Sequence, residues 1–129
     1  METRLNPRVF LKHIIYYKSK DIGYIQLVSY MIGSKGRNVP HLEYKIVDKE
    51  YRNKGIMSKQ LPCYINKYCK KDYPQLLAVV KKDNLISIGI LEKNGFVKFS
   101  EFKNEYTYIT DLNLKIDDIK KTLKEFRKE

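Results

Sequence analysis

The first half of the chain carries three short runs rich in β-branched and aromatic residues, separated by polar segments. The runs span residues 8–17, 22–30 and 42–47. Runs of this composition and length favour strands. The polar turn at residues 18–21 is short enough to join the first two as an antiparallel hairpin, whereas residues 31–40 contain the glycines and proline of a loop. The pattern predicts a hairpin, a loop and a third strand.

Between Gly55 and Tyr68 the apolar positions change from strand spacing to helical spacing. We expect an amphipathic helix here. Pro62 predicts a kink or an early break in it, because proline lacks the N–H that would bond to the carbonyl of Ser58. The apolar run at residues 76–80 favours a central strand, buried on both faces and parallel to the strand before the helix. Strand, helix and strand form a βαβ unit.

The rest of the chain predicts two more helices and a second hairpin. Asp83 is placed to cap a helix that Asn94 and Gly95 end, with Phe96 packing back against it. The remaining elements are strands at residues 97–102 and 106–110 and a helix at residues 116–127. The whole pattern predicts an α/β fold in one domain, residues 1–129, with a mixed, mostly antiparallel sheet, a βαβ core and a C-terminal helix.

Composition narrows the function classes only slightly. Hydrophobic residues make up 43% and charged residues 32%, and no apolar run approaches the roughly 18 residues of a membrane span. The start of the chain shows no signal peptide, so we expect a soluble, cytoplasmic protein. The net charge of +11 raises nucleic acid as a partner, but the lysines are scattered and form no block of five. A nucleic-acid-binding domain is therefore the less favoured alternative.

Two cysteines, Cys63 and Cys69, fall within the first expected helix. They lie on different faces of that helix, so they cannot pair there, and their spacing is not that of metal ligands. We interpret both as buried thiols and expect no metal site.

The segment Arg52–Ser58, between the third strand and the helix, has the chemistry of an anion site. The first N–H groups of a helix have no partner within it, and the helix dipole favours negative charge there. Gly55 lets the backbone approach a ligand closely, while Arg52, Lys54 and Lys59 add positive charge. Phosphate is the expected guest, the alternative being an ordinary solvated surface turn.

Two motifs occur in a fixed order along the chain. The segment Arg52–Met57 matches part of the pattern Gln/Arg-x-x-Gly-x-Gly/Ala. A second pattern, Asn-x-x-Ser/Ala followed by Glu-Lys-x-Gly-Phe, is matched by Asn84, Ser87, Glu92, Lys93, Gly95 and Phe96. With these motifs the chain resembles the GNAT superfamily of acetyl-CoA-dependent N-acetyltransferases over roughly residues 22–110. The resemblance implies transfer of an acetyl group from acetyl-CoA, as co-substrate, to a primary amine of a small molecule or protein.

The resemblance also implies where acetyl-CoA binds. Backbone amides of residues 53–58 hold the pyrophosphate, and the end of the third strand lines the pantetheine arm and bonds to it through its main chain. Asn84 contacts the same arm, with Ser87 one turn further on the same helical face, although both residues also suit an ordinary helix start. The expected cofactor-binding residues are Lys45, Ile46, Val47, Arg52, Asn53, Lys54, Gly55, Ile56, Met57, Ser58, Asn84 and Ser87.

Three departures from the family pattern favour an alternative function. Met57 stands where Gly or Ala is usual, so we expect a bulkier helix start near the diphosphate. Leu91 stands where many members have the tyrosine that protonates the departing thiolate. The region before Arg52 is also shorter than the family usually has. The alternative is a catalytically inactive module of the same fold that binds CoA or another protein.

A general base is needed to take a proton from the attacking amine. Glu43 and His41 lie on the third strand with side chains on the same face, because strands alternate. We favour Glu43, although a surface ion pair would also explain it, and His41 also suits a turn residue beside Pro40. His13 is expected to be a core histidine.

The last expected helix carries an apolar stripe that must be buried somewhere. Its residues are Leu112, Ile116, Ile119, Leu123 and Phe126. The stripe either covers sheet surface within the chain or pairs with a second copy, and we favour a homodimer.

Overall fold

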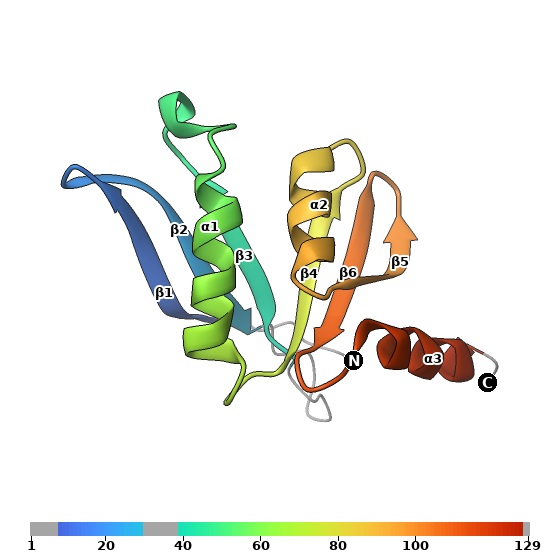
Figure 1. The fold of residues 1–129 in the computed structure, drawn as a ribbon. Coiled ribbons are helices and arrows are strands. Elements are labelled where there is room, and N and C mark those ends of the chain that lie inside the picture. Colours follow the sequence, from blue (N-terminus) through green and yellow to red (C-terminus); the bar gives the residue numbers. More distant parts are fainter. Residues whose placement is uncertain (1–7, 30–38, 128–129) are drawn as a thin grey trace.

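The computed structural model describes residues 8–29 and 39–127, and within them six strands form one sheet in the order β1-β2-β3-β4-β6-β5 (Figure 1). The strands are β1 (Arg8–Tyr17), β2 (Lys20–Ser29), β3 (His41–Ile46), β4 (Gln75–Lys81), β5 (Val97–Phe102) and β6 (Glu105–Asp111). The helices are α1 (Ile56–Tyr64), α2 (Leu85–Lys93) and α3 (Ile116–Arg127), with short turns η1 (Lys49–Tyr51) and η2 (Ile65–Cys69). Only β3 and β4 run parallel. The predicted mixed, mostly antiparallel sheet with its βαβ core is confirmed.

The hairpin of β1 and β2 is tighter than the sequence predicts. Tyr17 pairs with Lys20, so only Lys18 and Ser19 form the turn, with φ angles of 49° and 66°. Two central residues with positive φ match the twist of neighbouring strands. The hairpin is confirmed, but β2 begins at Lys20 instead of Ile22.

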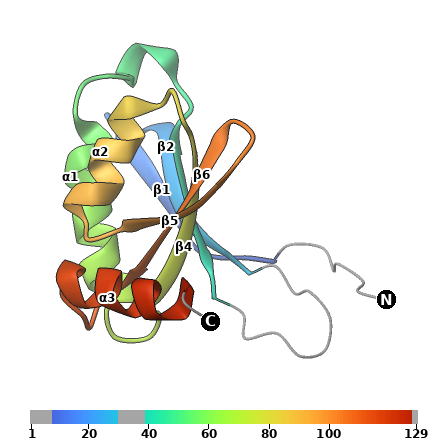
Figure 2. The same cartoon turned by 90° about the vertical axis from the view of Figure 1, so that its right-hand side faces the viewer.

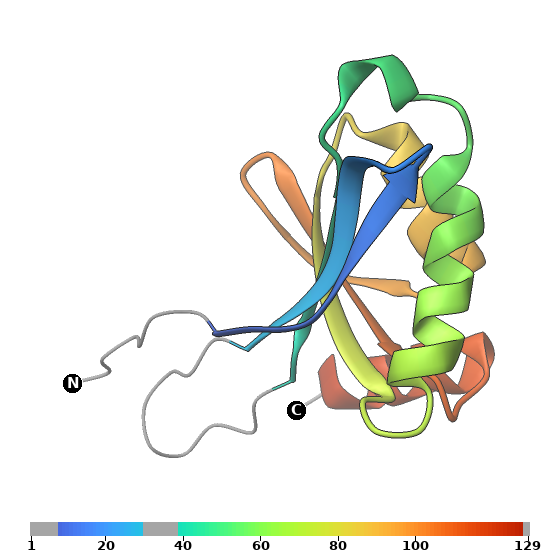
Figure 3. The same cartoon turned by 90° about the vertical axis from the view of Figure 1, so that its left-hand side faces the viewer.

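Both α1 and α2 lie on the same face of the sheet (Figures 2 and 3). The side chains of β4 alternate accordingly: Leu76, Ala78 and Val80 are buried, whereas Val79 is 47% exposed. The prediction that β4 is buried on both faces is therefore wrong. A continuous apolar run suggested two covered faces, but no helix in the described residues covers the face on which Val79 lies.

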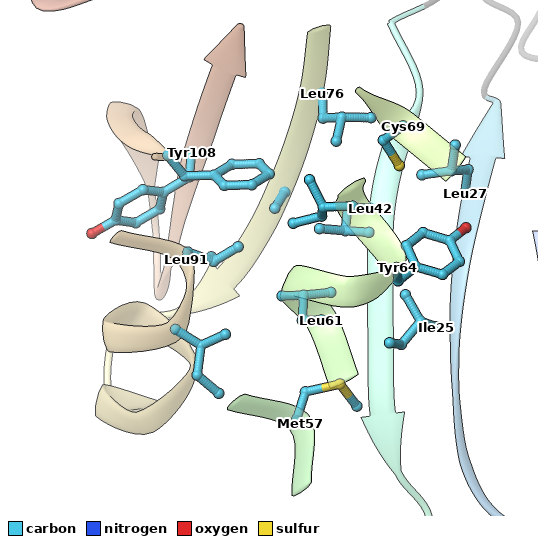
Figure 4. Packing of buried hydrophobic residues seen from close by; sticks show 14 of the residues in the cluster. Ile25, Leu27, Leu42, Met57, Leu61, Tyr64, Cys69, Leu76, Leu91 and Tyr108 are labelled. Carbon is cyan, nitrogen blue, oxygen red and sulfur yellow. The ribbon is translucent and has the colours of Figure 1, made fainter. Parts of the chain in front are cut away.

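The core fills the space between the sheet and these two helices (Figure 4). Leu61 of α1 and Leu91 of α2 are at most 1% exposed and belong to the same buried cluster as Leu76 of β4. Met57 belongs to the same cluster and is 7% exposed. Burying these side chains holds α1 and α2 at fixed positions above the sheet.

The regular α-helix at α1 ends two residues after Pro62, at Tyr64. The chain then continues as the π-helical turn η2, in which the Lys70 N–H donates to the carbonyl of Ile65 at 2.9 Å. Pro62 has no N–H for the carbonyl of Ser58, which weakens the α-helical ladder at this point. The early break is confirmed, although the chain keeps coiling beyond it.

Helix α2 has well-defined ends. Its N-cap is Asn84, whose Oδ1 accepts from the Ser87 N–H at 3.1 Å, so the prediction of Asp83 as the cap is wrong by one residue. At the other end Gly95 has φ 87°, its N–H donates to the Glu92 carbonyl, and the Phe96 N–H donates to the Leu91 carbonyl. This is a Schellman motif. The Glu-Lys-x-Gly-Phe pattern therefore encodes a helix end.

Helix α3 packs against β5 and lies below that strand in Figure 1. Ile119 and Leu123 are buried within the chain at 4% and 8% exposure, Leu112 packs against the core, and Ile116 remains 41% exposed. The Phe126 side chain lies outside the described residues. Part of the apolar stripe is thus buried within the chain itself, and the homodimer stays a prediction.

In residues 8–29 and 39–127 no helix is long and apolar enough to cross a membrane. Nor do three His, Cys, Asp or Glu side chains gather into a metal-binding cluster in those ranges.

Cys63 and Cys69 are both free, but only Cys69 is buried, so the prediction of two buried thiols is wrong for Cys63. Burial raises the pKa of the Cys69 thiol to about 12. We expect DTNB to react with one thiol of the native protein near pH 8 and with both in denaturant. Because the raised pKa keeps the folded thiol neutral, its contribution to stability is present below about pH 9 and falls as the pH approaches 12. Two fast-reacting thiols in the native protein would contradict this packing.

Candidate active site between α1, α2 and the divided sheet

The loop before α1 presents backbone N–H groups that no side chain caps. Asn53 and Gly55 adopt left-handed backbone conformations, with φ 61° and 75°, and Gly55 is the N-cap residue of α1. No side chain caps this end and no acidic residue lies in its first turn. By contrast, Asn84 caps α2 and Asp117 and Asp118 lie in the first turn of α3. The α1 N-terminus is the one of these three whose dipole is left for an external anion.

The guanidinium of Arg52 is used to hold the loop against the end of β3. Its Nε donates to the carbonyl of Ile46 at 2.9 Å and its Nη2 to the carbonyl of Val47 at 3.4 Å. The prediction that Arg52 adds positive charge is compatible with this structural role, because hydrogen bonds to carbonyl oxygens leave the guanidinium charged. Lys54 and Lys59 are exposed.

A hollow of about 420 Å³, here called the helix cleft, runs from this loop across the first turn of α2. Its lining residues are Tyr44, Lys45, Ile46, Tyr51, Arg52, Asn53, Lys54, Gly55, Ile56, Met57, Ser58, Asn84, Ile86, Ser87 and Ile90. The cleft therefore contains every predicted cofactor-binding residue except Val47. Met57 is 7% exposed, so most of its side chain packs in the core although it also lines the cleft, and the predicted bulk near the diphosphate stays a prediction.

The sheet divides where the helix cleft meets it. β3 and β4 are bridged at one position, His41 opposite Leu77, and then separate (Figure 1). The Val47 N–H donates to the Ile22 carbonyl at 2.8 Å. Since backbone groups alternate along a strand, those of Lys45 face β2 as well, and those of Tyr44 and Ile46 face the gap. Tyr44 and Ile46 thus face the gap with main-chain groups that pair with no strand, although the Ile46 carbonyl already accepts from Arg52 Nε.

Val47 does not belong to this site. Its N–H is bonded to Ile22, its carbonyl accepts from Arg52, and its side chain is exposed away from the helix cleft. The predicted main-chain bonds from Val47 to pantetheine stay untested, but the structure does not favour them, because the Val47 N–H faces β2 and its carbonyl faces Arg52.

A second hollow, the gap hollow, lies between β3 and β4 and has a volume of about 680 Å³. Glu43 and His41 both line it. Glu43 accepts a hydrogen bond from Nε2 of Gln26 at 3.0 Å, and Gln26 is only 8% exposed. A buried amide therefore orients the carboxylate. His13 lines neither hollow and lies beside Tyr64, with ring centroids 6.4 Å apart.

Tyr44 and Ser87 form a contact that sequence reasoning missed. The Tyr44 hydroxyl and Ser87 Oγ are 2.6 Å apart and join β3 to α2. Burial raises the pKa of the Tyr44 phenol, and the hydrogen bond with Ser87 opposes that shift. Tyr44 precedes the predicted Lys45 and alternates onto the helix side of β3, but 43 residues separate it from Ser87, so only tertiary structure reveals the pair.

Comparison with known proteins identifies the family. The family model described as "Acetyltransferase (GNAT) domain" matches residues 4–97. The chain belongs to the GNAT acetyltransferase family. No curated protein sequence is similar enough to this GNAT chain to count as a match.

Solved GNAT-like structures share the fold. PH1933 from Pyrococcus horikoshii is 25% identical with a TM-score of 0.62, covering 78% of this chain and 64% of that one. PaiA N-acetyltransferase from Thermoplasma acidophilum in complex with coenzyme A is 20% identical, TM-score 0.61, covering 80% and 60%. The N-acetyltransferase PseH from Campylobacter jejuni in complex with acetyl coenzyme A is 18% identical, TM-score 0.57, covering 78% and 66%. The GNAT chain thus spans no more than two thirds of the length of these proteins.

Asn84 caps α2 and is also predicted to contact the cofactor, and substitution can separate the observed role from the predicted one. Replacement by alanine removes the cap of α2 and is expected to lower stability by about 1 kcal/mol. Asn84→Ser keeps a capping oxygen and is expected to be as stable as the parent within about 0.5 kcal/mol. Both variants lose the amide that lines the two hollows. Chemical denaturation measures the cap and calorimetric titration with CoA measures the ligand contact. If Asn84→Ser binds CoA like the parent, the amide does not contact the ligand.

Proposed function

We propose that this protein transfers an acetyl group from acetyl-CoA to a primary amine of a small molecule or a protein. One observation carries the proposal. The uncapped N-terminus of α1 opens into the helix cleft, and that cleft continues to the gap between β3 and β4. An anion site at one end and unbridged strand backbone at the other suit an elongated ligand with phosphates and amides.

The chemistry of the lining fits acetyl-CoA along its length. Phosphates suit the amides of residues 56–58 and the exposed lysines around them. The amides of the pantetheine arm suit the main-chain groups of Tyr44 and Ile46, which otherwise lack a neighbouring strand. Asn84 and Ser87 add polar side chains on the opposite wall. Two solved relatives, PaiA and PseH, are complexes with coenzyme A and acetyl coenzyme A, which supports this assignment.

The gap hollow provides the route for the amine. It reaches the sheet face that neither α1 nor α2 covers, so an acceptor approaches from the side opposite the helix cleft. Glu43, oriented by Gln26, is the proposed base and takes the amine proton directly or through water. Main-chain N–H groups along the gap polarise the thioester carbonyl. Bound acetyl-CoA supplies the activated acyl group.

Two measurements test the proposal in sequence. Acetyl-CoA binding to the folded state must raise the melting temperature, by an amount that grows with ligand concentration. Thiol release from acetyl-CoA is then followed with a panel of amines that includes polyamines, amino sugars and peptide N-termini. The absence of any shift at millimolar acetyl-CoA would contradict the assignment of the cleft.

A second candidate is a module that binds CoA without transferring the acetyl group. The observation that favours it is Leu91, which lines the gap hollow and is 1% exposed. A leucine has no proton to give to a departing thiolate. This candidate predicts a melting-temperature shift with acetyl-CoA but no thiol release with any amine.

A further inference from the structure

Release of a thiol from a thioester requires a donor near the sulfur. As the C–S bond breaks, the electron pair stays on sulfur, and a positioned O–H group lowers the barrier by stabilising that charge. Leu91 cannot serve, because its side chain is apolar and buried. A side chain that takes this role must reach the junction of the two hollows, and a hydroxyl is the group that the family's missing tyrosine would have supplied.

Four residues line both the helix cleft and the gap hollow. They are Tyr44, Lys45, Asn84 and Ser87. Of these, only Tyr44 and Ser87 carry hydroxyl groups, and these oxygens are 2.6 Å apart. The pair therefore lies where the helix cleft passes into the gap between the strands.

Secondary structure holds this pair in place from both sides. Tyr44 lies on β3, which pairs with β2 along its whole length. Ser87 lies in the first turn of α2, and its N–H donates to Asn84 Oδ1 at 3.1 Å. Neither hydroxyl needs a large rearrangement to meet a ligand in the gap.

The charge state of Tyr44 suits a donor and excludes a base. Burial raises the pKa of its phenol, so the phenol keeps its proton at neutral pH. Glu43 is its neighbour on β3, and alternation places the two side chains on opposite faces of the strand. A carboxylate thus faces the gap hollow from the uncovered face, and a phenol faces the helix side.

We infer that Tyr44, supported by Ser87, donates the proton that the departing thiolate needs in the proposed reaction. The amine nitrogen forms a bond to the acyl carbon, and Glu43 or a water takes the proton that the nitrogen loses. The C–S bond breaks, and Tyr44 Oη gives its proton to the sulfur. The Ser87 hydroxyl donates to the resulting phenolate until a proton returns from water. Glu43 then passes its proton to solvent while Tyr44 regains one, so a neutral amine reacts with no net release of protons.

The first test compares Tyr44→Phe with Tyr108→Phe. The Tyr108 hydroxyl also joins a strand to α2, by donating to Glu92 at 3.2 Å, but it lines neither hollow. We expect Tyr44→Phe to lower kcat about 100-fold with KM for acetyl-CoA within about twofold of the parent. Ser87→Ala should lower kcat about tenfold. Tyr108→Phe should leave kcat within about twofold of the parent. This variant also removes a hydrogen bond between a strand and α2, so it shows whether loosening α2 is enough to lower the rate.

The second test does not depend on turnover. In protein labelled with ¹³C at the tyrosine Cζ position, Tyr44→Phe identifies the Tyr44 resonance. That resonance should move when CoA is added and move less with desulfo-CoA, which lacks the sulfur. It should also titrate above the ordinary pKa of a phenol, because burial raises the pKa of Tyr44.

The outcomes separate this inference from the proposed function on which it rests. If the parent neither binds acetyl-CoA nor releases thiol, the proposed function fails. If the parent is active and Tyr44→Phe keeps its rate, only the donor assignment is overturned, and loss of rate in Ser87→Ala alone would move the donor to Ser87. An equal response of the Tyr44 resonance to CoA and desulfo-CoA would also overturn it.

Discussion

Replacing Gly55 by valine is expected to abolish acetyl-CoA binding in a protein that still folds. At φ 75° a β-branched residue is strained, which costs roughly 1–2 kcal/mol of stability. No atom lies within 4 Å of a Cβ built at Gly55, so the new side chain projects into open space at the mouth of the helix cleft. It would stand where phosphate approaches the α1 amides. The phosphate would lose its charge-assisted hydrogen bonds to two of these amides, at about 1.5–3 kcal/mol each. The affinity for acetyl-CoA should therefore fall at least about 100-fold. Calorimetric titration and denaturation measure the two effects.

Gly55→Asn is the matched control for backbone conformation. Asparagine tolerates left-handed φ better than valine, so this variant should keep nearly the parent stability. It still places a side chain at the mouth of the cleft and should also bind acetyl-CoA weakly. Parent-like affinity in Gly55→Asn would show that valine acts only through the backbone, and parent-like affinity in both variants would show that the loop does not hold the phosphates.

Truncating Ile119 or Leu123 of α3 is expected to destabilise the folded chain measurably. Both are buried against the body of the molecule, and truncating either to alanine is expected to cost about 2 kcal/mol. This value lies at the lower end for buried aliphatic residues because an apolar hollow of about 320 Å³ already borders both side chains. Urea denaturation of the two single variants and of the double variant gives the loss.

Ile116→Ala is the control on the same helix. Ile116 is 41% exposed, so its truncation should cost less than about 1 kcal/mol. Equal losses at all three positions would contradict the packing of α3. Sedimentation of the intact chain also decides the predicted homodimer, which is excluded if the protein is monomeric at high micromolar concentration.

Most secondary structure could be predicted from local pattern. The Lys18-Ser19 turn, the helical spacing from Gly55 and the Asn94-Gly95 helix end are local signals, and each appears in the structure within one or two residues. Pro62 likewise ends the regular α-helix by removing a single donor.

The features that the sequence could not predict depend on tertiary contacts. Val79 stands in an apolar run, yet it is exposed because both neighbouring helices lie on one side of the sheet. Tyr44 is an ordinary strand residue until α2 brings Ser87 to it. Asn84 caps α2 in place of Asp83 because the helix begins one residue later than predicted. Local composition does not determine a helix start to within one residue.

Because only His41 and Leu77 are bridged between β3 and β4, few backbone hydrogen bonds join the two halves of the described sheet. One half consists of β1, β2 and β3 and the other of β4, β6 and β5. Beyond the bridged pair, β3 and β4 form no further backbone pairs. A ligand in the gap could pair with Tyr44 and Ile46 on one side and contact Asn84 on the other. Such a ligand would connect the two halves of the sheet. Its binding free energy would then oppose separation of the two halves of the sheet. Slowed hydrogen exchange should accordingly appear on both sides of the gap when the ligand binds, including at β4 positions far from the phosphates.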